Sequence, residues 1–394
     1  MTETHAVPAV TMTMMPGTWR PTEAQELVLD AALADPVRAE AAFEQWVTLT
    51  GFDEVDAGSY RLLPLVSARF EQLGITGPWS AHLRGILRRS WYENQLMLRG
   101  TLPAVDLLQA AGIDVIVLKG GAVSVLAYPS VGARPMDDLD VFVPEAQAAD
   151  ALELLLDAGW QLGTEGVPTA MRRGEVPASF RRLRHSTGLT GPDGFDIDLH
   201  WHATYAWCWP GADRDLWADA RPLELGGRSL LALSAPDELI VACVHGCLAN
   251  LIAPIRWVSD SVLVMRSVAM SWDTLVRRAR DLLVEPHLAR ALGYLRTRFD
   301  APVPEWVFAA LGQRRPGYFE RQWLVSRMDL RETRTLAAHY GAYLRGARAE
   351  TGFQRYVGGV PNHLVYQLGC DSTSELSGEL ARRAAARLRR VARA

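Results

Sequence analysis

Residues 116–143 read IVLKGGAVSVLAYPSVGARPMDDLDVFV, and this stretch decides the fold. Two apolar, β-branched runs, at 113–118 and 139–143, are typical of buried strands. Between them stands a Gly-Gly pair followed by apolar residues, which predicts a turn and then a helix from about Ala122. Glycines at a strand-to-helix turn let backbone amides approach a phosphate closely. The turn is therefore a candidate phosphate-binding site.

Two carboxylates enter the second of these strands. Asp138 and Asp140 are separated by one apolar residue, and strand residues two apart point to the same face of a sheet. Neighbouring carboxylates repel each other unless a cation or a proton lies between them. Hard oxygen ligands favour Mg²⁺ or Mn²⁺, so the pair predicts a divalent-metal site. The alternative is a solvated strand end with two exposed acids.

A third polar cluster lies in the stretch FDIDLHWHA (195–203), where polar and apolar residues alternate strictly. The apolar side must be buried, so the polar side faces a cleft or solvent. That side carries Asp196, Asp198, His200 and His202. A carboxylate on it would complete a three-acid metal cluster with the first two acids. The two histidines would equally suit zinc or general-base chemistry.

The periodicity of apolar residues divides the chain into four regions. A Thr/Met/Pro-rich start without periodicity predicts a loose tail, and helical periods precede and follow the strand-rich part. The predicted regions are the tail (1–20), an N-terminal helical region (21–112), an α/β core (113–230) and a C-terminal helical region (231–394). We therefore predict an α+β protein in which a small mixed β-sheet is flanked by helical regions on both sides.

Individual elements follow from the same pattern. Pro103 predicts a helix break near Thr101, because proline lacks an amide donor. Ser234 is a good N-cap for a further helix. The other predictions are helices at 145–159, 257–268, 272–284, 286–299 and 331–347, strands at 160–164, 183–190 and 195–201, and a loop at 165–178.

Composition excludes several classes of protein. Of the 394 residues, 49% are hydrophobic and 22% are charged, which excludes a mostly disordered chain. The net charge of −4 provides no basic field over the whole chain for nucleic acid. No apolar run reaches the roughly 18 residues of a membrane span, and no signal peptide is evident. We therefore expect a cytoplasmic protein with no membrane partner.

One lysine stands among 41 basic residues, and the other 40 are arginine. This bias is typical of a GC-rich genome, which uses arginine wherever either residue serves. Lysine carries a compact ammonium that the planar guanidinium fork does not replace. Lys119, beside the Gly-Gly turn, is therefore a candidate for a point contact with phosphate.

The order of these pieces resembles the nucleotidyltransferase superfamily with the polymerase-β-like fold. It resembles more closely the bacterial family described as uncharacterised nucleotidyltransferases. Five separated pieces carry the resemblance, over about residues 60–265. They are AGIDVIVLKG (111–120), Tyr128, RPMDDLD (134–140), DLHW (198–201), and His245 with RWVSD (256–260).

The resemblance implies transfer of a nucleoside monophosphate from an NTP, such as ATP, to an acceptor, with release of pyrophosphate. It implies that Asp138 and Asp140 bridge two Mg²⁺ or Mn²⁺ ions, and that Asp198 holds the ion that activates the acceptor. Asp196 is the rival for this third position. Asp198 is preferred because it stands two residues before a histidine, as the acid of the family does.

Nucleotide binding is assigned to the residues around the turn. Gly120 and Gly121 are expected to present amides to the β- and γ-phosphates. Lys119 either neutralises charge on the triphosphate or forms a salt bridge with one of the two acids. Arg134 either contacts phosphate or braces its loop.

The histidines have supporting roles in this scheme. His200 either binds the acceptor or hydrogen-bonds an acid that holds a metal ion, and His185 is expected to face the same cleft. For His245 and Asp260 we expect a structural contact between the helical region and the core.

Three functions fit this sequence. The first is an active nucleotidyltransferase that modifies a small molecule, a peptide or a sugar. The second is a catalytically inactive member that binds nucleotide or a partner. The presence of all three acids argues against this second function. The third is a toxin-like enzyme that adds nucleotides to tRNA, which the arginine-rich end (379–394) permits.

Overall fold

The computed structural model describes residues 19–163, 184–247, 255–328, 335–367 and 372–391. The predicted loop at 165–178 and the predicted tail up to residue 18 lie outside these ranges. Trp19, at the end of that tail, packs its ring against the rings of Trp257 and Tyr294, with centroid distances of 6.4 and 5.9 Å. The described part of the chain therefore begins inside the helical core.

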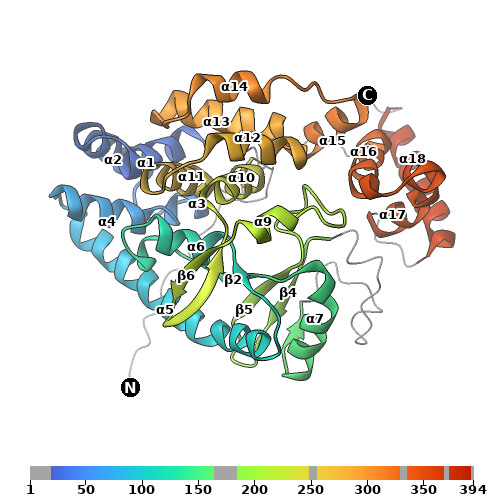
Figure 1. Cartoon of the computed structure of the whole chain (residues 1–394). Helices are drawn as coiled ribbons and strands as arrows, with labels where there is room; N and C mark the ends of the chain where they lie inside the picture. Colours follow the sequence, from blue (N-terminus) through green and yellow to red (C-terminus); the bar gives the residue numbers. More distant parts are fainter. Residues whose placement is uncertain (1–18, 164–183, 248–254, 329–334, 368–371, 392–394) are drawn as a thin grey trace.

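A mixed sheet of seven strands, in the order β3-β4-β5-β2-β1-β7-β6, organises the fold (Figure 1). β2 pairs parallel with β5 and β1 pairs parallel with β7, whereas the other neighbours are antiparallel. The predicted α+β class, a mixed sheet between helical regions, is confirmed. The strands are β1 (Ile116–Val117), β2 (Asp138–Phe142), β3 (Gln161–Leu162), β4 (Ser186–Thr190), β5 (Asp196–His200), β6 (Arg221–Leu225) and β7 (Arg228–Ala232).

β6 and β7 form a hairpin at one edge of the sheet. The sequence pattern predicts no strand in this part of the chain. Gly226 and Gly227 join them, with φ angles of 57° and 75°. A two-residue hairpin turn of this kind requires positive φ at both positions, so the Gly-Gly pair is the signal that marks the hairpin. β7 then pairs with β1, so the sheet extends as far as Ala232.

Helix α6 (Lys119–Leu126) begins at Lys119 and not at about Ala122 as predicted. The strand before it is correspondingly short, because Leu118 is already the extended N-cap of the helix. Gly120 and Gly121 thus lie in the first turn of α6 rather than in a loop. The first amides of a helix have no partner within it, so the turn remains able to bind an anion.

Of the N-terminal helices, α5 packs against the sheet, where it contacts β2 and β5. The predicted break near Thr101 is wrong: α5 runs without interruption through Pro103. Leu102, Val105 and Leu108 on this segment are buried in the core that the sheet shares, and their packing offsets the donor lost at the proline. These helices are α1 (Glu23–Leu33), α2 (Pro36–Thr50), α3 (Ala57–Tyr60), α4 (Leu63–Leu73) and α5 (Ser80–Ala110).

The middle of the chain contributes short elements beside the strands. The helix predicted over 145–159 begins as a 3₁₀ turn, and α7 packs against α5. These elements are the 3₁₀ turns η1 (Val131–Ala133) and η2 (Glu145–Gln147), and the helices α7 (Ala148–Asp157) and α9 (Arg214–Ala218).

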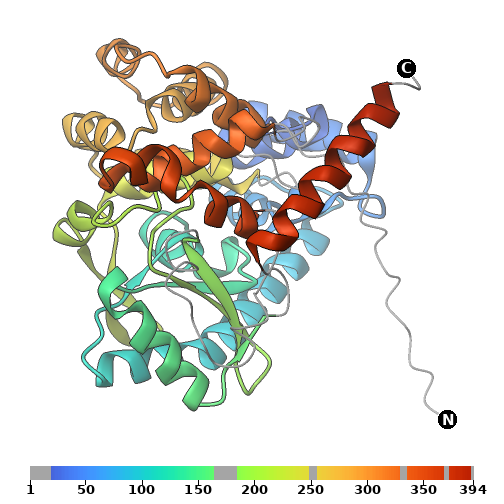
Figure 2. The same cartoon turned by 90° about the vertical axis from the view of Figure 1, so that its right-hand side faces the viewer.

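The C-terminal helices form two groups. Figure 1 shows α10–α14 together above the sheet, and Figure 2 shows α15–α18 as an outer layer on another side. No helix in the described ranges has the length and apolar character needed to cross a bilayer. The elements are α10 (Ala235–Gly246), α11 (Arg256–Ser267), α12 (Trp272–Asp281), α13 (Glu285–Phe299), α14 (Glu305–Leu311), α15 (Tyr318–Met328), α16 (Leu336–Gly346), η4 (Ala347–Ala349), the π-helical η5 (Gln354–Gly358), α17 (Val360–Gln367) and α18 (Thr373–Val391).

We expect Gly246→Ala to destabilise the protein. A methyl group at Gly246 on α10 would lie 2.0 Å from Cγ and 2.1 Å from Cβ of Trp257 on α11, so the two helices would have to separate. Overpacking of this kind costs about 1–3 kcal/mol of unfolding free energy. Urea denaturation measures the change.

The matched control is Gly85→Ala, on the exposed face of α5, where a methyl group meets nothing within 4 Å. Alanine at such a position stabilises a helix by roughly 0.5–1 kcal/mol. Equal effects of the two substitutions would contradict the close packing of α10 on α11.

Candidate active site

The parallel pairing of β2 with β5 places two acids side by side. In this register Asp140 is opposite Asp198, and Asp138 is opposite Asp196. An oxygen of Asp140, an oxygen of Asp198 and a ring nitrogen of His200 all lie within 4.8 Å of one another. Asp198, and not Asp196, therefore stands beside Asp140.

The other two acids of the motifs are placed differently. Asp196 is exposed and accepts a hydrogen bond of 2.6 Å from Oγ1 of Thr190. Asp138 lines a cavity at the end of β2. Desolvation there, together with the carboxylates of Asp140 and Asp198, raises the pKa of Asp138 to about 6. Asp138 is thus a neighbour of the three-residue cluster and not one of its members.

His200 lies between the two acids of the cluster. Its Nε2 is 3.0 Å from Oδ1 of Asp140 and 3.0 Å from Oδ2 of Asp198, and its Nδ1 is 3.2 Å from the carbonyl oxygen of His202. Both ring nitrogens face acceptors, so each carries a hydrogen. Although burial and Lys119 oppose protonation, the two carboxylates raise the pKa of His200 to about 9.

Lys119 supplies a second positive charge to the same acids. Its Nζ lies 2.6 Å from Oδ1 of Asp140 and 3.4 Å from Nε2 of His200. Burial lowers the pKa of Lys119, but Asp140 and Asp198 more than offset that effect and leave it above the usual value. The pKa of Asp140 is held well below its usual range, because Lys119 and His200 outweigh the effect of burial.

The backbone at Lys119 is strained. Its φ of 45° lies in the left-handed region, which non-glycine residues seldom adopt. This conformation begins α6 directly after β1 and leaves the ammonium on the acids of β2. Strain of this kind persists only where the surrounding structure fixes it, and it is frequent at functional sites.

His185 lies behind the cluster. Its ring is 5.3 Å from the ring of His200 and 5.7 Å from that of Tyr205. Burial and the nearby charge of His200 hold the pKa of His185 well below its usual value, so the ring is neutral. It does not line the cavity that Asp138 lines, so in the described structure it supports His200 from behind.

The two glycines have different surroundings. A methyl group on Gly120 would lie 2.4 Å from Nη1 of Arg134, and Gly120 lines the cavity. A methyl group on Gly121 would lie 2.5 Å from Cγ1 of Val117 and 2.9 Å from Cδ1 of Leu139. Gly121 is therefore required by the packing of α6 on the sheet, whatever its amide binds.

The loop before Asp138 is held by a buried asparagine of α5. Nδ2 of Asn94 donates to the carbonyl oxygens of Val131 and Arg134, at 2.7 and 2.9 Å. Its Oδ1 accepts from the amide of Met136 at 3.0 Å. One side chain thus fixes three points of the segment that leads into β2.

Arg134 forms a buried ion pair with the C-terminal helices. Its Nε and Nη2 donate to the two carboxylate oxygens of Asp260 at 2.8 and 2.7 Å. The hydroxyl of Tyr128 donates to Oδ1 of the same acid at 2.6 Å. In this geometry Arg134 holds its own loop in place, which is one of the two roles predicted for it. Asp260 makes the structural contact expected from the sequence.

A cavity of about 450 Å³ opens beside the cluster. Asp138, Asp140 and Asp198 line it next to Lys119 and Gly120. Residues of α10, α11 and the end of α3 also line it, so both helical regions contribute to the cavity. A cavity of this size is typical of small-molecule sites.

Two arginines of this lining lie outside the predicted site. Arg256 donates to the carbonyl oxygen of Pro135 and has no carboxylate partner among the described residues. Burial and the nearby charges of Arg134 and Arg61 lower its pKa to about 10. Arg61 forms an ion pair with Asp137, the acid that precedes the DxD pair. No local pattern reveals Arg61, because its contact spans 76 residues.

Glu238 of α10 is a further cavity residue that the sequence does not single out. It is 1% exposed, and its Oε1 has no hydrogen-bond partner in the part of the chain that is described. Burial and the charge of Asp260 raise the pKa of Glu238 well above the usual value.

The donors of the cluster fit a divalent cation. Asp140 and Asp198 offer hard oxygen atoms, and His200 would offer Nε2 once a cation displaces its hydrogen, while Nδ1 stays bonded to a carbonyl oxygen. That arrangement of a histidine is typical of metal ligands. Two cationic side chains already neutralise the acids, which shows that the site accommodates positive charge.

The chain matches the family model described as uncharacterised nucleotidyltransferase over residues 57–300. The chain belongs to this family. The match includes the cluster, the glycine turn, the arginines and the helices that close the cavity. A search of curated proteins found no match for this chain.

Among solved structures, this family member is similar to an antigenic nucleotidyltransferase-like protein from Paracoccidioides brasiliensis. The sequences are 16% identical, and the similarity covers 55% of this chain and 97% of that one, with a TM-score of 0.37.

We expect Asp260→Ala to destabilise the protein strongly. The substitution leaves the guanidinium of Arg134 buried without its carboxylate partner. Removing one member of a buried pair costs about 3–5 kcal/mol of unfolding free energy. Thermal and urea unfolding measure the loss.

Glu93→Ala is the control, because it removes an exposed ion pair with Arg89 on α5. Such a pair contributes at most about 0.5 kcal/mol. An Asp260→Ala protein as stable as Glu93→Ala would contradict the bracing role of Arg134.

Proposed function

We propose that this protein transfers a nucleoside monophosphate from an NTP to an acceptor and releases pyrophosphate, by polymerase-β-like chemistry with Mg²⁺ or Mn²⁺. The observation that carries the proposal is the cluster of Asp140, Asp198 and His200 beside a cavity that arginines also line. Membership of the nucleotidyltransferase family supports the reaction class. We propose a small molecule, a peptide or a sugar as acceptor, and the cytoplasm as the compartment.

Asp138, Asp140 and Asp198 would hold the metal ions, with Asp198 as the third acid. Bound there, two divalent ions supply positive charge at the attacking and leaving oxygens of an in-line displacement. His200 either takes part through Nε2 or orients both acids by hydrogen bonds.

Asp198 is better suited to hold a cation than to accept a proton. His200 holds its pKa below the usual range despite burial. The hydroxyl of Ser186 also donates to Oδ2 of Asp198 at 3.1 Å. A carboxylate stabilised in this way stays ionised at neutral pH, and its low basicity makes it a weak general base.

The triphosphate would lie on the positive part of the cavity. Gly120 would present its backbone amide at the N-terminus of α6, and Lys119 and Arg256 would neutralise phosphate oxygens. Arg256 is suited to this because no carboxylate among the described residues neutralises it. Arg134 uses two of its nitrogens on Asp260, which leaves Nη1, near Gly120, as its contribution.

We expect Asp140→Asn and Asp138→Asn to abolish turnover. Each removes a charge that holds the metal, and the loss of such electrostatic stabilisation lowers the rate by about a hundredfold or more. The assay follows α-labelled NTPs with Mg²⁺ or Mn²⁺ and a cell extract, and detects label on a macromolecule or a metabolite together with pyrophosphate.

Asp196→Asn is the matched control on β5, because its side chain is exposed and bonds Thr190. It should keep nearly the full rate. An Asp140→Asn enzyme with wild-type turnover would refute the metal assignment. If Asp196→Asn loses turnover while Asp198→Asn keeps it, Asp196 and not Asp198 is the third acid.

We expect Lys119→Arg to impair turnover although the charge is kept. The ammonium makes a point contact of 2.6 Å with Asp140 in a buried position, where a planar fork requires different geometry. A misplacement of about 1 Å lowers the rate by up to roughly a hundredfold. Steady-state kinetics test this, with circular dichroism as the check on folding, and an unchanged kcat/KM would mean that the single lysine is accidental.

A further inference from the structure

A second cavity, of about 400 Å³, lies between α15, α16, α17 and the segment after β5. It shares no lining residue with the first cavity. Nothing in the proposed transfer reaction uses it. Its lining combines aromatic rings, two arginines and a buried histidine, which is the mixture of apolar surface and few polar groups typical of ligand sites.

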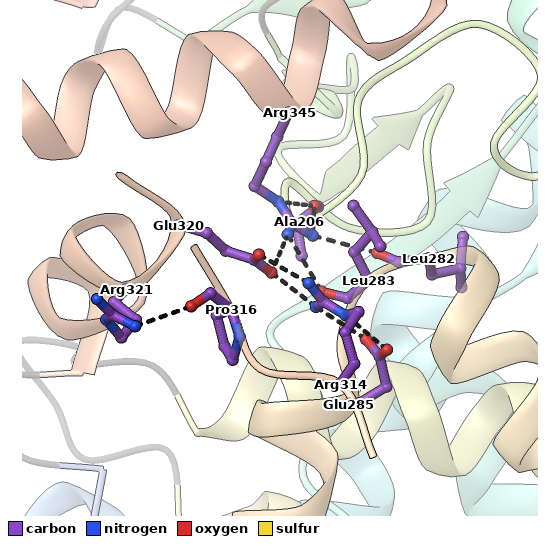
Figure 3. A network of polar contacts seen from close by, with 9 residues as sticks. All are labelled: Ala206, Leu282, Leu283, Glu285, Arg314, Pro316, Glu320, Arg321 and Arg345. Atoms are coloured by element: carbon purple, nitrogen blue, oxygen red, sulfur yellow. Dashed lines mark hydrogen bonds and ion pairs between the residues drawn. The ribbon is translucent and has the colours of Figure 1, made fainter. Parts of the chain in front are cut away.

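Arg345 of α16 lines one wall of this cavity, and all three of its guanidinium nitrogens donate hydrogen bonds. Arg345 donates to the carbonyl oxygens of Ala206, Leu282 and Leu283, and it also contacts Glu320, as Figure 3 shows. Arg314 in turn joins Glu320 to Glu285. This network ties α16 to α15, to the turn between α12 and α13 and to the segment after β5, so that wall of the cavity is preorganised.

Arg327 of α15 is the cation available to a ligand. Its guanidinium lies 4.6 Å from the ring centre of Tyr205. Unlike Arg345, it has no carboxylate within ion-pair distance among the described residues. Glu350 also lines the cavity, but it is exposed, so water screens its charge. A bound anion would therefore give Arg327 the charged partner that the described residues do not provide.

His363 of α17 offers a hydrogen bond inside the cavity. It is 5% exposed, and the backbone of His339 forms a hydrogen bond with its ring. Although that hydrogen bond raises the pKa of His363, burial and the charge of His339 lower it to about 4, so the neutral ring provides one donor and one acceptor. One of these two groups remains for a polar atom of a ligand in the cavity.

The rest of the lining suits a flat ring. Tyr205, Trp323 and Tyr343 contribute aromatic rings, and glycines 346, 358 and 359 contribute positions without side chains. Aromatic rings pair with other rings in stacked or edge-on arrangements. A planar ligand would also lie against Tyr205, whose ring is in contact with His185 behind the cluster of the first site.

We propose that this cavity binds a small anionic molecule with a planar ring, an aromatic carboxylate or an aromatic phosphate. Arg327 contacts the anionic group, His363 hydrogen-bonds a polar atom of the ligand, and the aromatic side chains cover the ring. The site is separate from the nucleotide cavity.

Binding of benzoate and phenyl phosphate to the full-length protein, measured by ligand-observed NMR titration, tests the proposal. Benzylamine serves as the cationic counterpart of these probes. We expect saturable binding of at least one anionic probe, which also distinguishes a carboxylate from a phosphate, and none of benzylamine. Arg327→Gln should weaken binding by about tenfold, as expected for the loss of one hydrogen bond to a charged group.

The matched control is Arg321→Gln, an arginine on the same helix that bonds Pro316 and does not line the cavity. It should bind like the wild type. His363→Phe, checked for folding by thermal unfolding, should weaken binding as well. Absence of binding by both anionic probes, equal binding of benzylamine, or wild-type binding by Arg327→Gln would overturn the proposal.

The second site is independent of nucleotidyl transfer, so an experiment can refute either proposal without refuting the other. Asp140→Asn should bind the probe like the wild type, and ATP with Mg²⁺ should not displace it. Displacement by ATP would place the probe in the first cavity and would overturn the proposal of a second site.

Discussion

The fold depends on balancing two negative charges, one buried and one half-buried, that adjacent parallel strands bring into register. Asp140 and Asp198 face each other across β2 and β5, and their repulsion would destabilise the sheet centre without a cation. Lys119 and His200 supply that charge here. A divalent ion at these oxygens would take the place of the hydrogen bonds that Lys119 and His200 make with them.

Contacts from distant parts of the chain fix the surroundings of the acids. Asn94 holds the loop before β2 from the N-terminal side, and Asp260 holds Arg134 from the C-terminal side. Arg61 adds a contact with Asp137. The helical regions are thus parts of the cavity and not appendages. A residue far from the acids in sequence can therefore alter the site through this loop.

The sequence predicts the local part of this arrangement well. Strict alternation of polar and apolar residues places Asp198 on the polar face of one strand. The spacing of the DxD pair places both of its acids on one face of another strand. The sequence favours Asp198 over Asp196 only through the histidine that follows it, whereas the strand register places Asp198 opposite Asp140. Arg61 and Arg256 could not be assigned, because tertiary contacts bring them to the cavity. Pro103 misled the prediction since the packing of α5 outweighs one lost hydrogen bond.

The most direct test of the central claim is the position of a bound metal ion. Crystals grown with Mn²⁺ and a non-hydrolysable NTP analogue would give an anomalous difference map at the manganese edge. We predict a peak within coordination distance of both Asp140 and Asp198, which disappears in Asp140→Asn crystals. A bound analogue with manganese elsewhere, or with none at these carboxylates, would contradict the account.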